Sequence, residues 1–477
     1  MRHTDVAIVG GGFAGSMVAA MLGRIGHDAI LVDPHPVYPK DFRCEKLDAS
    51  QIALLRKTGL ADAVARASTL DQEVWIARFG RVVEKKPSEQ LDFLYDTAVN
   101  AVRAEIPARV PVICAKAAAA SASADRQHLT LSNGEEISAR LIVLANGLNI
   151  SLRHSLGIDR EVISPCHSIS IGFDVSPAAG GSFGFRALTY YGEQTALRTA
   201  YLTLFPIGAM TRANLFVYRD MDDPWLREMR RHGGEALFAV LPRLRRLTGA
   251  VEVSDVKIRP VDLYVSKGHR QAGIVLVGDA FATSCPAAGT GCNKVLTDVE
   301  RLCNVHVPRW LATPGMGMDK IVAFYDDEVK VACERYCLDK ADVTSSNLVR
   351  YTSDFNDLTI NCFSINPPSK HIASKIFRVR RSVCASLHPF RRFPNSRVSR
   401  SLRRSSLVAL MHYAGSAADR CLKACHLRHP LGSARQGRRD AAHLNSRVVV
   451  PSAPTKKNTQ WSQDKPRARM ALAQDEP

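Results

Sequence analysis

The stretch VAIVGGGFAGSMVAAMLGRIGHDAILVD (6–33) decides the fold of this chain. An apolar run precedes three glycines, an Ala-rich amphipathic segment follows them, and a second apolar run ends at Asp33. An apolar run, a glycine turn, a helical period and another apolar run are typical of a strand–turn–helix–strand unit with parallel strands. We therefore predict an α/β fold that opens with a dinucleotide-binding unit.

The glycines of this turn have the spacing G-x-G-x-x-G. Gly10 permits the tight turn, Gly12 lets the backbone approach a pyrophosphate, and Gly15 lets the helix pack closely on the strand. The start of the helix supplies N–H groups and a partial positive charge, so Phe13 and Ala14 join the predicted contacts. A glycine turn with a purely structural role is the alternative.

Asp33 ends the second predicted strand, 18 residues after Gly15. A carboxylate at this position accepts hydrogen bonds from the adenosine ribose and would repel a ribose phosphate. The dinucleotide expected here is therefore not NADP.

A second segment, VGDAFATSCPAAGTGCNKVLTDVERL (277–302), follows another apolar run. Its Gly-Asp-Ala is followed by Pro at +8, Gly at +11 and +13, Asn at +15, Asp at +20 and Leu at +24. This spacing resembles the distal flavin motif of group A FAD monooxygenases, the para-hydroxybenzoate hydroxylase-like flavoproteins. The resemblance covers about residues 5–345.

The resemblance implies FAD as the cofactor and assigns Asp279 to the ribityl hydroxyls. Glycines before a helix expose its N–H groups, here to the flavin's carbonyl edge, where reduction builds negative charge. A generic loop with a capping Asp is the alternative. The predicted contacts in this segment are Gly278, Asp279, Pro286, Gly289, Gly291 and Asn293.

Two further segments resemble the family. In FRCEKLDASQIALLRKTGL (42–60), Arg43 falls on the arginine that the family places against the flavin and its pyrophosphate; a solvated surface arginine is the alternative. LANGLNISLR (144–153) matches the family's central motif, with Asn146 for its Asp and with Gly147 and Arg153 retained. We expect Asn146 and Gly147 at the flavin, and Arg43 and Arg153 at the phosphates of a reduced nicotinamide.

The resemblance implies a Rossmann-like FAD-binding domain, with a mixed or parallel sheet and helices, interleaved with an antiparallel-sheet substrate domain. We predict the FAD-binding domain at 1–70, 88–175 and 265–345, and the substrate domain at 71–87 and 176–264. The substrate pocket is expected along the antiparallel sheet, lined by aromatic side chains, with His167 as a candidate polar group. Aromatic residues at this spacing also form the core of a sheet, which is the alternative. The expected lining includes Tyr190, Tyr191, Tyr201, Phe205 and Phe216.

The implied function is that of an FAD-dependent monooxygenase. It would hydroxylate a small aromatic or isoprenoid-type molecule through a flavin hydroperoxide, with NAD(P)H as electron donor, and no catalytic side chain is assigned. Two alternatives stay open: an FAD-dependent dehydrogenase or reductase of the geranylgeranyl-reductase type, and a degenerate, non-catalytic flavoprotein. The altered central motif favours the reductase among these alternatives.

The net charge of +18 belongs to one end of the 477-residue chain. Residues 1–370 carry 42 Lys and Arg against 41 Asp and Glu, whereas residues 371–477 carry 22 against 5. Bulk charge therefore gives the folded part no reason to bind nucleic acid. We expect the tail 371–477 to be disordered; a helix at 398–427 on an anionic membrane surface is the alternative.

The 12 cysteines include no C-x-x-C pair and no completed zinc-ligand set, so we expect reduced thiols and no metal. The chain contains neither a signal-peptide pattern nor a run of 18 apolar residues. A cytoplasmic enzyme acting on a small molecule is the simplest expectation, with the oligomeric state left open.

Overall fold

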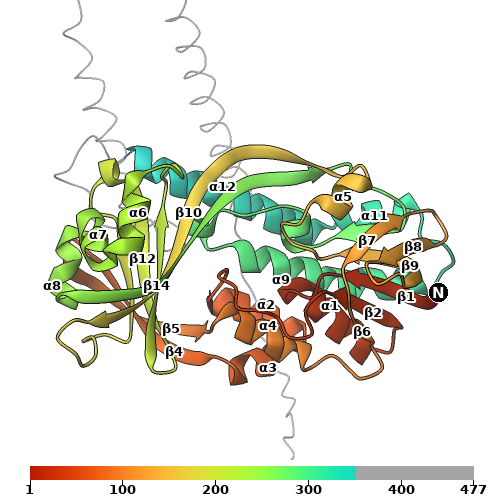
Figure 1. Ribbon diagram of the computed structural model, residues 1–477, viewed down its shortest axis with the longest axis horizontal. Helices are drawn as coiled ribbons and strands as arrows, with labels where there is room; N and C mark the ends of the chain where they lie inside the picture. Colours follow the sequence, from red (N-terminus) through yellow and green to blue (C-terminus); the bar gives the residue numbers. More distant parts are fainter. Residues whose placement is uncertain (351–477) are drawn as a thin grey trace, which may run out of the picture. The chain divides into compact units, whose positions relative to one another are not determined.

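The computed structural model describes residues 1–350, with side chains up to residue 345 (Figure 1). The predicted tail at 371–477 and its helix at 398–427 lie outside the described residues. Within the described part, no helix is both long and apolar enough to cross a membrane.

The first sheet contains the predicted dinucleotide-binding unit. Its parallel strands, in the order in which they pair, are β6 (Val112–Cys114), β2 (Ala29–Asp33), β1 (Arg2–Val9), β9 (Glu136–Leu144) and β15 (Ile274–Leu276). The first half of β9 also pairs with the antiparallel hairpin of β8 (Gln127–Leu131) and β7 (Ala117–Ser121). Because carboxyl ends of parallel strands share one edge, the segments that follow β1, β2, β9 and β15 meet there.

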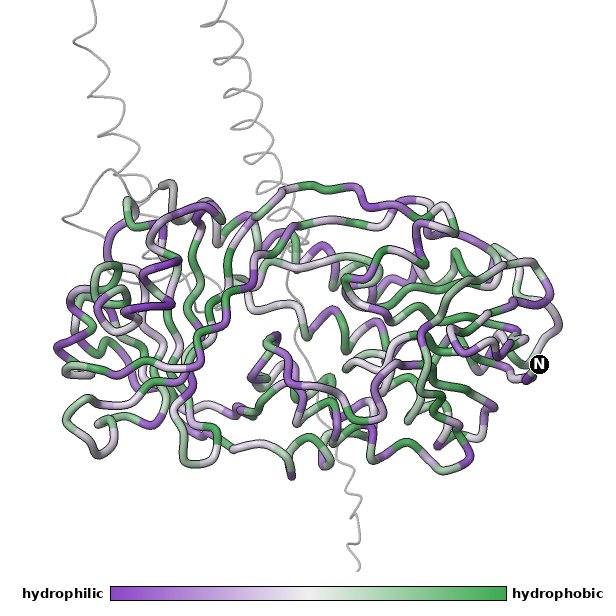
Figure 2. The backbone as a smooth tube through the Cα atoms, viewed as in Figure 1, coloured by the Kyte–Doolittle hydropathy of each residue, from purple (hydrophilic) through white to green (hydrophobic). Residues whose placement is uncertain are grey.

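The apolar runs that predicted these strands form the largest core. Val6–Val9 of β1 and Leu141–Leu144 of β9 are buried, and α1 (Phe13–Arg24) packs against β1 and β2. In Figure 2 the hydrophobic, green parts of the tube follow these strands close to the N-terminus. Burial on both faces explains why the strands are continuously apolar rather than alternating.

The second sheet has eight strands and is antiparallel except where β11 pairs with β4. In pairing order its strands are β14 (Val251–Lys267), β10 (Asp159–Pro177), β13 (Met210–Val217), β12 (Thr199–Ile207), β11 (Ala187–Tyr191), β4 (Thr69–Arg78), β5 (Arg81–Asp92) and β3 (Lys46–Leu47). The two sheets confirm the predicted fold class, a Rossmann-like layer interleaved with an antiparallel sheet.

Strands β10 and β14 are long and pair along most of their length, arching between the two halves of the fold in Figure 1. Strand β10 crosses the predicted boundary between residues 175 and 176, and β14 crosses the one between residues 264 and 265. The division into two domains remains our prediction.

The remaining elements are mostly short helices. They are α2 (Ala49–Lys57), α3 (Ala61–Arg66), α4 (Tyr95–Arg103), α5 (Ser151–Ser155), η1 (Thr195–Leu197), α6 (Pro224–Arg231), α7 (Gly233–Val240), η2 (Pro242–Leu244), α8 (Arg245–Thr248), η3 (Gly278–Ala280), η4 (Pro286–Ala288), α9 (Gly291–Arg301), η5 (Leu302–His306), α10 (Val307–Leu311), α11 (Met318–Tyr325) and α12 (Glu328–Arg350). The helical pattern at 88–105 predicts one helix, but β5 extends to Asp92 because Leu91 and Asp92 pair with both β3 and β4.

Candidate functional site

The glycine turn after β1 is shaped by close approaches within the chain. Gly10 has a φ of +100°, and a β-carbon there would lie 2.7 Å from the carbonyl oxygen of Ala145. A β-carbon on Gly15 would lie 1.8 Å from the carbonyl oxygen of Gly10. These two glycines are therefore required by the fold itself.

Gly12 and Gly291 differ from them. Gly12 has an ordinary φ of −72°, and the nearest side-chain atoms to a β-carbon there would be 3.8 Å away. A β-carbon placed on Gly291 would have no atom of the described residues within 4 Å. Gly12 caps α1 and Gly291 opens α9, so each helix start has free space beside its backbone. Packing does not require glycine at these positions, whereas the predicted close approach of FAD would require it.

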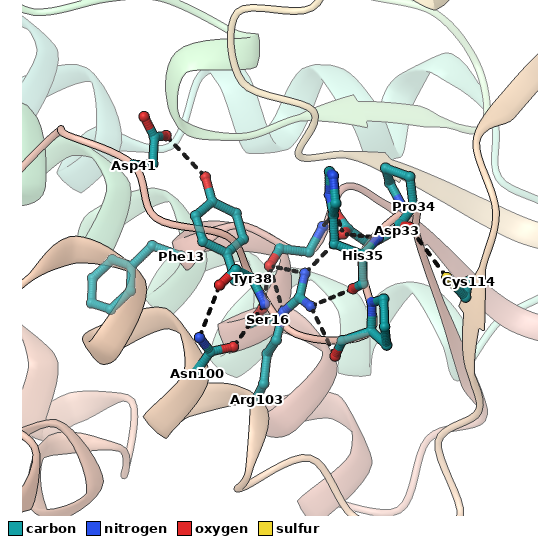
Figure 3. Close-up of polar contacts among 12 residues, drawn as sticks. Phe13, Ser16, Asp33, Pro34, His35, Tyr38, Asp41, Asn100, Arg103 and Cys114 are labelled. Carbon is teal, nitrogen blue, oxygen red and sulfur yellow. Dashed lines mark hydrogen bonds and ion pairs between the residues drawn. The ribbon is translucent and has the colours of Figure 1, made fainter.

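Asp33 lies beside the same turn and is nearly buried (Figure 3). Its Oδ2 accepts the Gly11 N–H at 2.7 Å, and its Oδ1 accepts the His35 N–H at 2.9 Å. Arg103, from α4, forms an ion pair with Oδ1 at 3.0 Å and also donates to the Gly11 carbonyl oxygen. Since each carboxylate oxygen accepts two hydrogen bonds, Oδ2 retains capacity for a ribose hydroxyl. The ribose contact of Asp33 remains a prediction.

Arg43 joins the 42–60 segment to the distal segment. Its Nη1 donates to Asp279 Oδ2 at 3.2 Å, across 236 residues of sequence, and its Nε donates to Asp41 at 2.7 Å. Arg259, from β14, donates to the other oxygen of Asp41. Burial lowers the pKa of Arg43, but Tyr95, Asp279 and Asp41 raise it more, so the guanidinium stays charged. A permanent cation and an acceptor carboxylate thus lie side by side at the sheet edge.

The Gly278-Asp279 turn is hydrogen-bonded to a buried ion pair between Asp298 and Lys330. Asp298 in α9 accepts the Gly278 N–H at 2.9 Å and also binds Lys330 of α12 at 2.6 Å, and both of these charged side chains are fully buried. A β-carbon on Gly278 would lie 3.7 Å from the side chain of Ala14 in α1. The distal segment therefore lies directly beside the first glycine turn.

Gln51 joins α2 to the start of α9. Its Nε2 donates at 2.8 Å both to the carbonyl oxygen of Gly289 and to Oδ1 of Asn293. Its Oε1 accepts the N–H of Asp48, which caps α2. Gln51 is thus well placed to orient the predicted contacts at Gly289, Gly291 and Asn293.

In the central motif, Asn146 and Gly147 lie beside the glycine turn and free space, whereas Arg153 is buried. Gly147, with a φ of +55°, has no atom within 4 Å of an added β-carbon, and Asn146 lies against Gly10. Arg153, however, is 1% exposed and donates to the carbonyl oxygens of Gly147, Asn149 and Ala280. This burial does not favour the predicted role of Arg153 at nicotinamide phosphates, because its guanidinium already donates to carbonyl oxygens of its own loop and of Ala280.

The antiparallel sheet presents an aromatic patch to the distal segment. Tyr201 donates to the carbonyl oxygen of Ala287 at 3.0 Å, in the turn that Pro286 opens. Phe216 packs on Tyr201 with ring centroids 4.8 Å apart, and Tyr191 lies 6.1 Å from the same ring. We call Tyr191, Tyr201, Phe216 and Tyr218 the aromatic patch.

Two of the expected lining residues do not join the aromatic patch. Tyr190 is fully buried in the core against α6 and α7, because alternation along β11 turns it to the opposite face from Tyr191. Phe205 is fully buried beneath Lys46. The ring of His167 lies edge-on to Tyr218, with centroids 5.7 Å apart, and its buried Nε2 has no hydrogen-bond partner within residues 1–345.

The arrangement fits a flavin dinucleotide. Two helix starts with free space, a cation and a carboxylate converge at one sheet edge, as the predicted FAD contacts require. Two buried acceptors beside it, Asn146 Oδ1 and Thr290 Oγ1, have no hydrogen-bond partner among the residues that the structure describes. Within residues 1–345, no group of three His, Cys, Asp or Glu side chains is arranged to hold a metal ion.

Sequence reasoning missed Gln51, Arg103 and Arg259. The spacing of Asp48 and Gln51 is that of a capping box, which predicts the start of α2 from the sequence. It does not predict the hydrogen bonds from Gln51 to Gly289 and to Asn293 of α9. Arg103 and Arg259 carry no local signal, because their partners lie in distant segments.

Replacing Asp279 with alanine is expected to weaken FAD binding. The change removes the Arg43 contact and the predicted ribityl contact, and a hydrogen bond to a charged group contributes about 1.5–3 kcal/mol. The dissociation constant should rise roughly 10- to 150-fold. Fluorescence titration of FAD-free protein measures this, with the exposed Asp222→Ala as control. Full FAD occupancy of the Asp279→Ala variant would remove our assignment of the distal segment.

Comparison with known proteins gives an independent result. A family model described as "FAD binding domain" matches residues 3–305. The 3-demethoxyubiquinol 3-hydroxylase of Escherichia coli (strain K12) is 28% identical over 337 residues, which are 64% of this chain and 80% of that protein. The menaquinone reductase of Mycobacterium tuberculosis (strain ATCC 25618 / H37Rv) is 30% identical over 164 residues, which are 32% of this chain and 40% of that protein.

Among solved structures, the p-nitrophenol 4-monooxygenase PnpA from Pseudomonas putida DLL-E4 superimposes with a TM-score of 0.59 at 17% identity. The match covers 75% of this chain and 91% of PnpA. At this identity the likeness establishes a shared fold.

Proposed function

This chain belongs to the FAD-binding-domain family, and we propose that it is a monooxygenase that hydroxylates a small phenol or quinol ring with NAD(P)H as electron donor. FAD is its cofactor, and the chain is an oxidoreductase. By their names, one relative acts on a demethoxyubiquinol and a protein of the same fold on p-nitrophenol, which motivates the substrate class. We place the enzyme in the cytoplasm as part of the same proposal.

The observation that carries the proposal is the hydrogen bond from Tyr201 to Ala287. It fastens the aromatic patch to the turn between Asp279 and α9, so a planar substrate on the patch would lie next to the predicted flavin contacts. Tyr218 continues the patch, its hydroxyl 3.7 Å from the Cys285 thiol. Aromatic faces bind planar rings through stacking and edge contacts.

Bound FAD supplies the oxygen-transfer chemistry, and the chain binds, orients and shields. Arg43 and Asp279 would hold the cofactor's polar parts, and the first turn of α9 would supply partial positive charge to the bound flavin. The aromatic patch would exclude water from a substrate bound on it. No described side chain is required as a dedicated base in this scheme.

The nicotinamide donor needs cations near the flavin. Arg43 remains our candidate, and Arg259 replaces Arg153, because Arg259 is partly exposed and shares Asp41 with Arg43. Arginine recognises phosphate by paired hydrogen bonds. On binding the donor, both guanidinium groups would give up their ion pairs with Asp41 and bind the phosphates instead.

The reductase alternative keeps a specific observation in its favour. Asn146 replaces the family's Asp, and the menaquinone reductase matches 164 residues of the chain. The aromatic patch serves either reaction, since both need a planar substrate against the flavin.

Isotope labelling distinguishes the two reactions. Turnover with NAD(P)H and a panel of phenols, quinols and isoprenoids under labelled oxygen is expected to place one labelled atom in the product, detected by mass spectrometry. Product formed at full rate without oxygen, with another acceptor present, would establish the reductase instead. If no panel member stimulates NAD(P)H oxidation above a free-flavin control, the non-catalytic alternative is favoured.

A further inference from the structure

Residues 42–46, which we call the bridging segment, connect the antiparallel sheet to the predicted flavin contacts. Arg43, in this segment, donates to Asp279 of the distal segment. The residues on both sides of Arg43 contact the antiparallel sheet instead. The position of Arg43 therefore depends on how its neighbours are held on that sheet.

The two ends of the bridging segment are docked on strands of the antiparallel sheet. Phe42 is buried, and its ring lies so close to Gly172 of β10 that a β-carbon on Gly172 would overlap the ring. At the other end, the Nζ of Lys46 lies 5.2 Å from the centre of the Phe205 ring in β12. These contacts fix where the segment begins and ends on the sheet.

Glu45 binds the sheet through its carboxylate. The Nε of Arg212 donates to both carboxylate oxygens, at 3.0 Å and 3.1 Å, and the Nδ2 of Asn214 donates to Oε2 at 2.7 Å. Glu45 and Arg212 are each 2% exposed. The backbone carbonyl oxygen of Glu45 also accepts the N–H of Phe93 at 2.9 Å. A buried, charge-assisted network of this kind holds both the side chain and the backbone of Glu45 in one arrangement.

The partners of the bridging segment lie together on one face of the sheet. Gly172 of β10 and Asn214 of β13 are directly paired, and Arg212 lies two residues before Asn214, so its side chain is on the same face. Phe216, two residues after Asn214 on that face, belongs to the aromatic patch. The contacts of Glu45 therefore border the surface that we propose for the substrate.

We propose that Glu45 is a positioning residue for FAD binding. Its bonds to Arg212 and Asn214 hold the bridging segment on the antiparallel sheet, and they thereby keep the Arg43 guanidinium at Asp279. When these bonds are weakened, Arg43 moves more freely and binds the flavin dinucleotide less tightly. FAD affinity is thus set in part by the sheet that carries the aromatic patch. The proposal rests on the predicted FAD contact of Arg43.

A double-mutant cycle on the full chain tests the proposal. Fluorescence titration of FAD-free protein gives the FAD dissociation constants of Glu45→Gln, Arg43→Ala and the double variant. Glu45→Gln should raise the dissociation constant roughly 3- to 30-fold, as expected of a change that acts through a neighbouring residue. In the Arg43→Ala background the same change should alter it at most about twofold. A residue that only stabilises the fold would weaken FAD binding equally in both backgrounds.

A second variant moves the bridging segment without removing a charge. Gly172→Ala displaces the Phe42 ring, so it should weaken FAD binding in the original chain and not in Arg43→Ala. Asp174→Asn is the matched control, because Asp174 also accepts from Arg212, at 2.9 Å, but lies on β10 outside the bridging segment. Its FAD dissociation constant should stay within about twofold of the original value. Urea unfolding establishes that each variant is folded under the titration conditions.

Three results would overturn the proposal. They are unchanged FAD affinity in Glu45→Gln, equal losses from this change with and without Arg43, and a loss in Asp174→Asn as large as that in Glu45→Gln. Unchanged FAD affinity in Arg43→Ala would remove the predicted contact of Arg43 and the proposal with it. The proposed hydroxylation does not enter these measurements, because they detect FAD binding alone.

Discussion

Alanine at Gly12 is expected to weaken FAD binding without weakening the fold, and alanine at Gly15 to do the reverse. At Gly12 the nearest described atoms to the added methyl group belong to Tyr38 and Tyr95, both 3.8 Å away, so the methyl group fills space that we assign to the pyrophosphate. Overpacking typically costs about 1–3 kcal/mol, so the FAD dissociation constant should rise roughly 5- to 150-fold.

At Gly15 the methyl group would lie 1.8 Å from the backbone carbonyl oxygen of Gly10, and backbone must move to accept it. We expect the FAD-free protein to lose at least about 3 kcal/mol of unfolding free energy, the upper end of overpacking costs. Urea unfolding measures stability, and calorimetric titration measures FAD binding.

Gly184 offers a matched control, because it is exposed and has no atom within 4 Å of an added β-carbon. Alanine there should change neither stability nor FAD binding. If Gly12→Ala binds FAD as tightly as the original chain, the space beside α1 does not belong to the cofactor.

Replacing Lys330 with methionine is expected to destabilise the protein by about 3–5 kcal/mol, because the change leaves a buried charge without its partner. Lys330 lies 2.6 Å from Asp298 and from Glu334, among the rings of Phe281 and Phe324. Differential scanning calorimetry and urea unfolding of the full chain measure the loss.

The double variant Asp298→Asn with Lys330→Met separates charge from packing. Asparagine keeps an acceptor for the Gly278 N–H while removing the unpaired charge, so the double variant should be more stable than Lys330→Met alone. The surface pair of Lys257 and Asp255 provides the control, and Lys257→Met should cost at most about 1 kcal/mol. Equal losses for the two lysine variants would contradict our account of the buried pair.

FAD binding should weaken in Lys330→Met in proportion to the displacement of the Gly278 turn. Asp298 holds this turn through one hydrogen bond, and Asp279 is the next residue. Recovery of FAD affinity in the double variant would show that Asp298 acts on Asp279 by positioning its backbone.

The local parts of the site were predictable from the sequence. The glycine turn with Asp33 and the turn from Gly278 to Asn293 each lie between a strand and a helix, and short-range periodicity and spacing indicate both. The fold class follows from the same patterns, because an apolar strand before a glycine turn and a helix has few other solutions.

The side-chain environment was less predictable. The identity of Arg153 suggested an accessible cation, but its guanidinium is buried among backbone carbonyl oxygens. Tyr190 and Tyr191 are equivalent in composition, and only the register of β11 sends one into the core and the other to the aromatic patch. Such outcomes depend on packing, which local sequence does not encode.

By itself, the sequence determined the two strand–turn–helix segments and the chemistry of the residues in them, since these features depend on neighbours within a few positions. Only the tertiary structure decided which charges meet: Arg43 with Asp279, Arg103 with Asp33, and Lys330 with Asp298. For the first two pairs the physical reason is that parallel strands joined by long crossovers gather their carboxyl ends at one edge, so partners far apart in sequence become neighbours. Lys330 and Asp298 meet because α12 packs against α9.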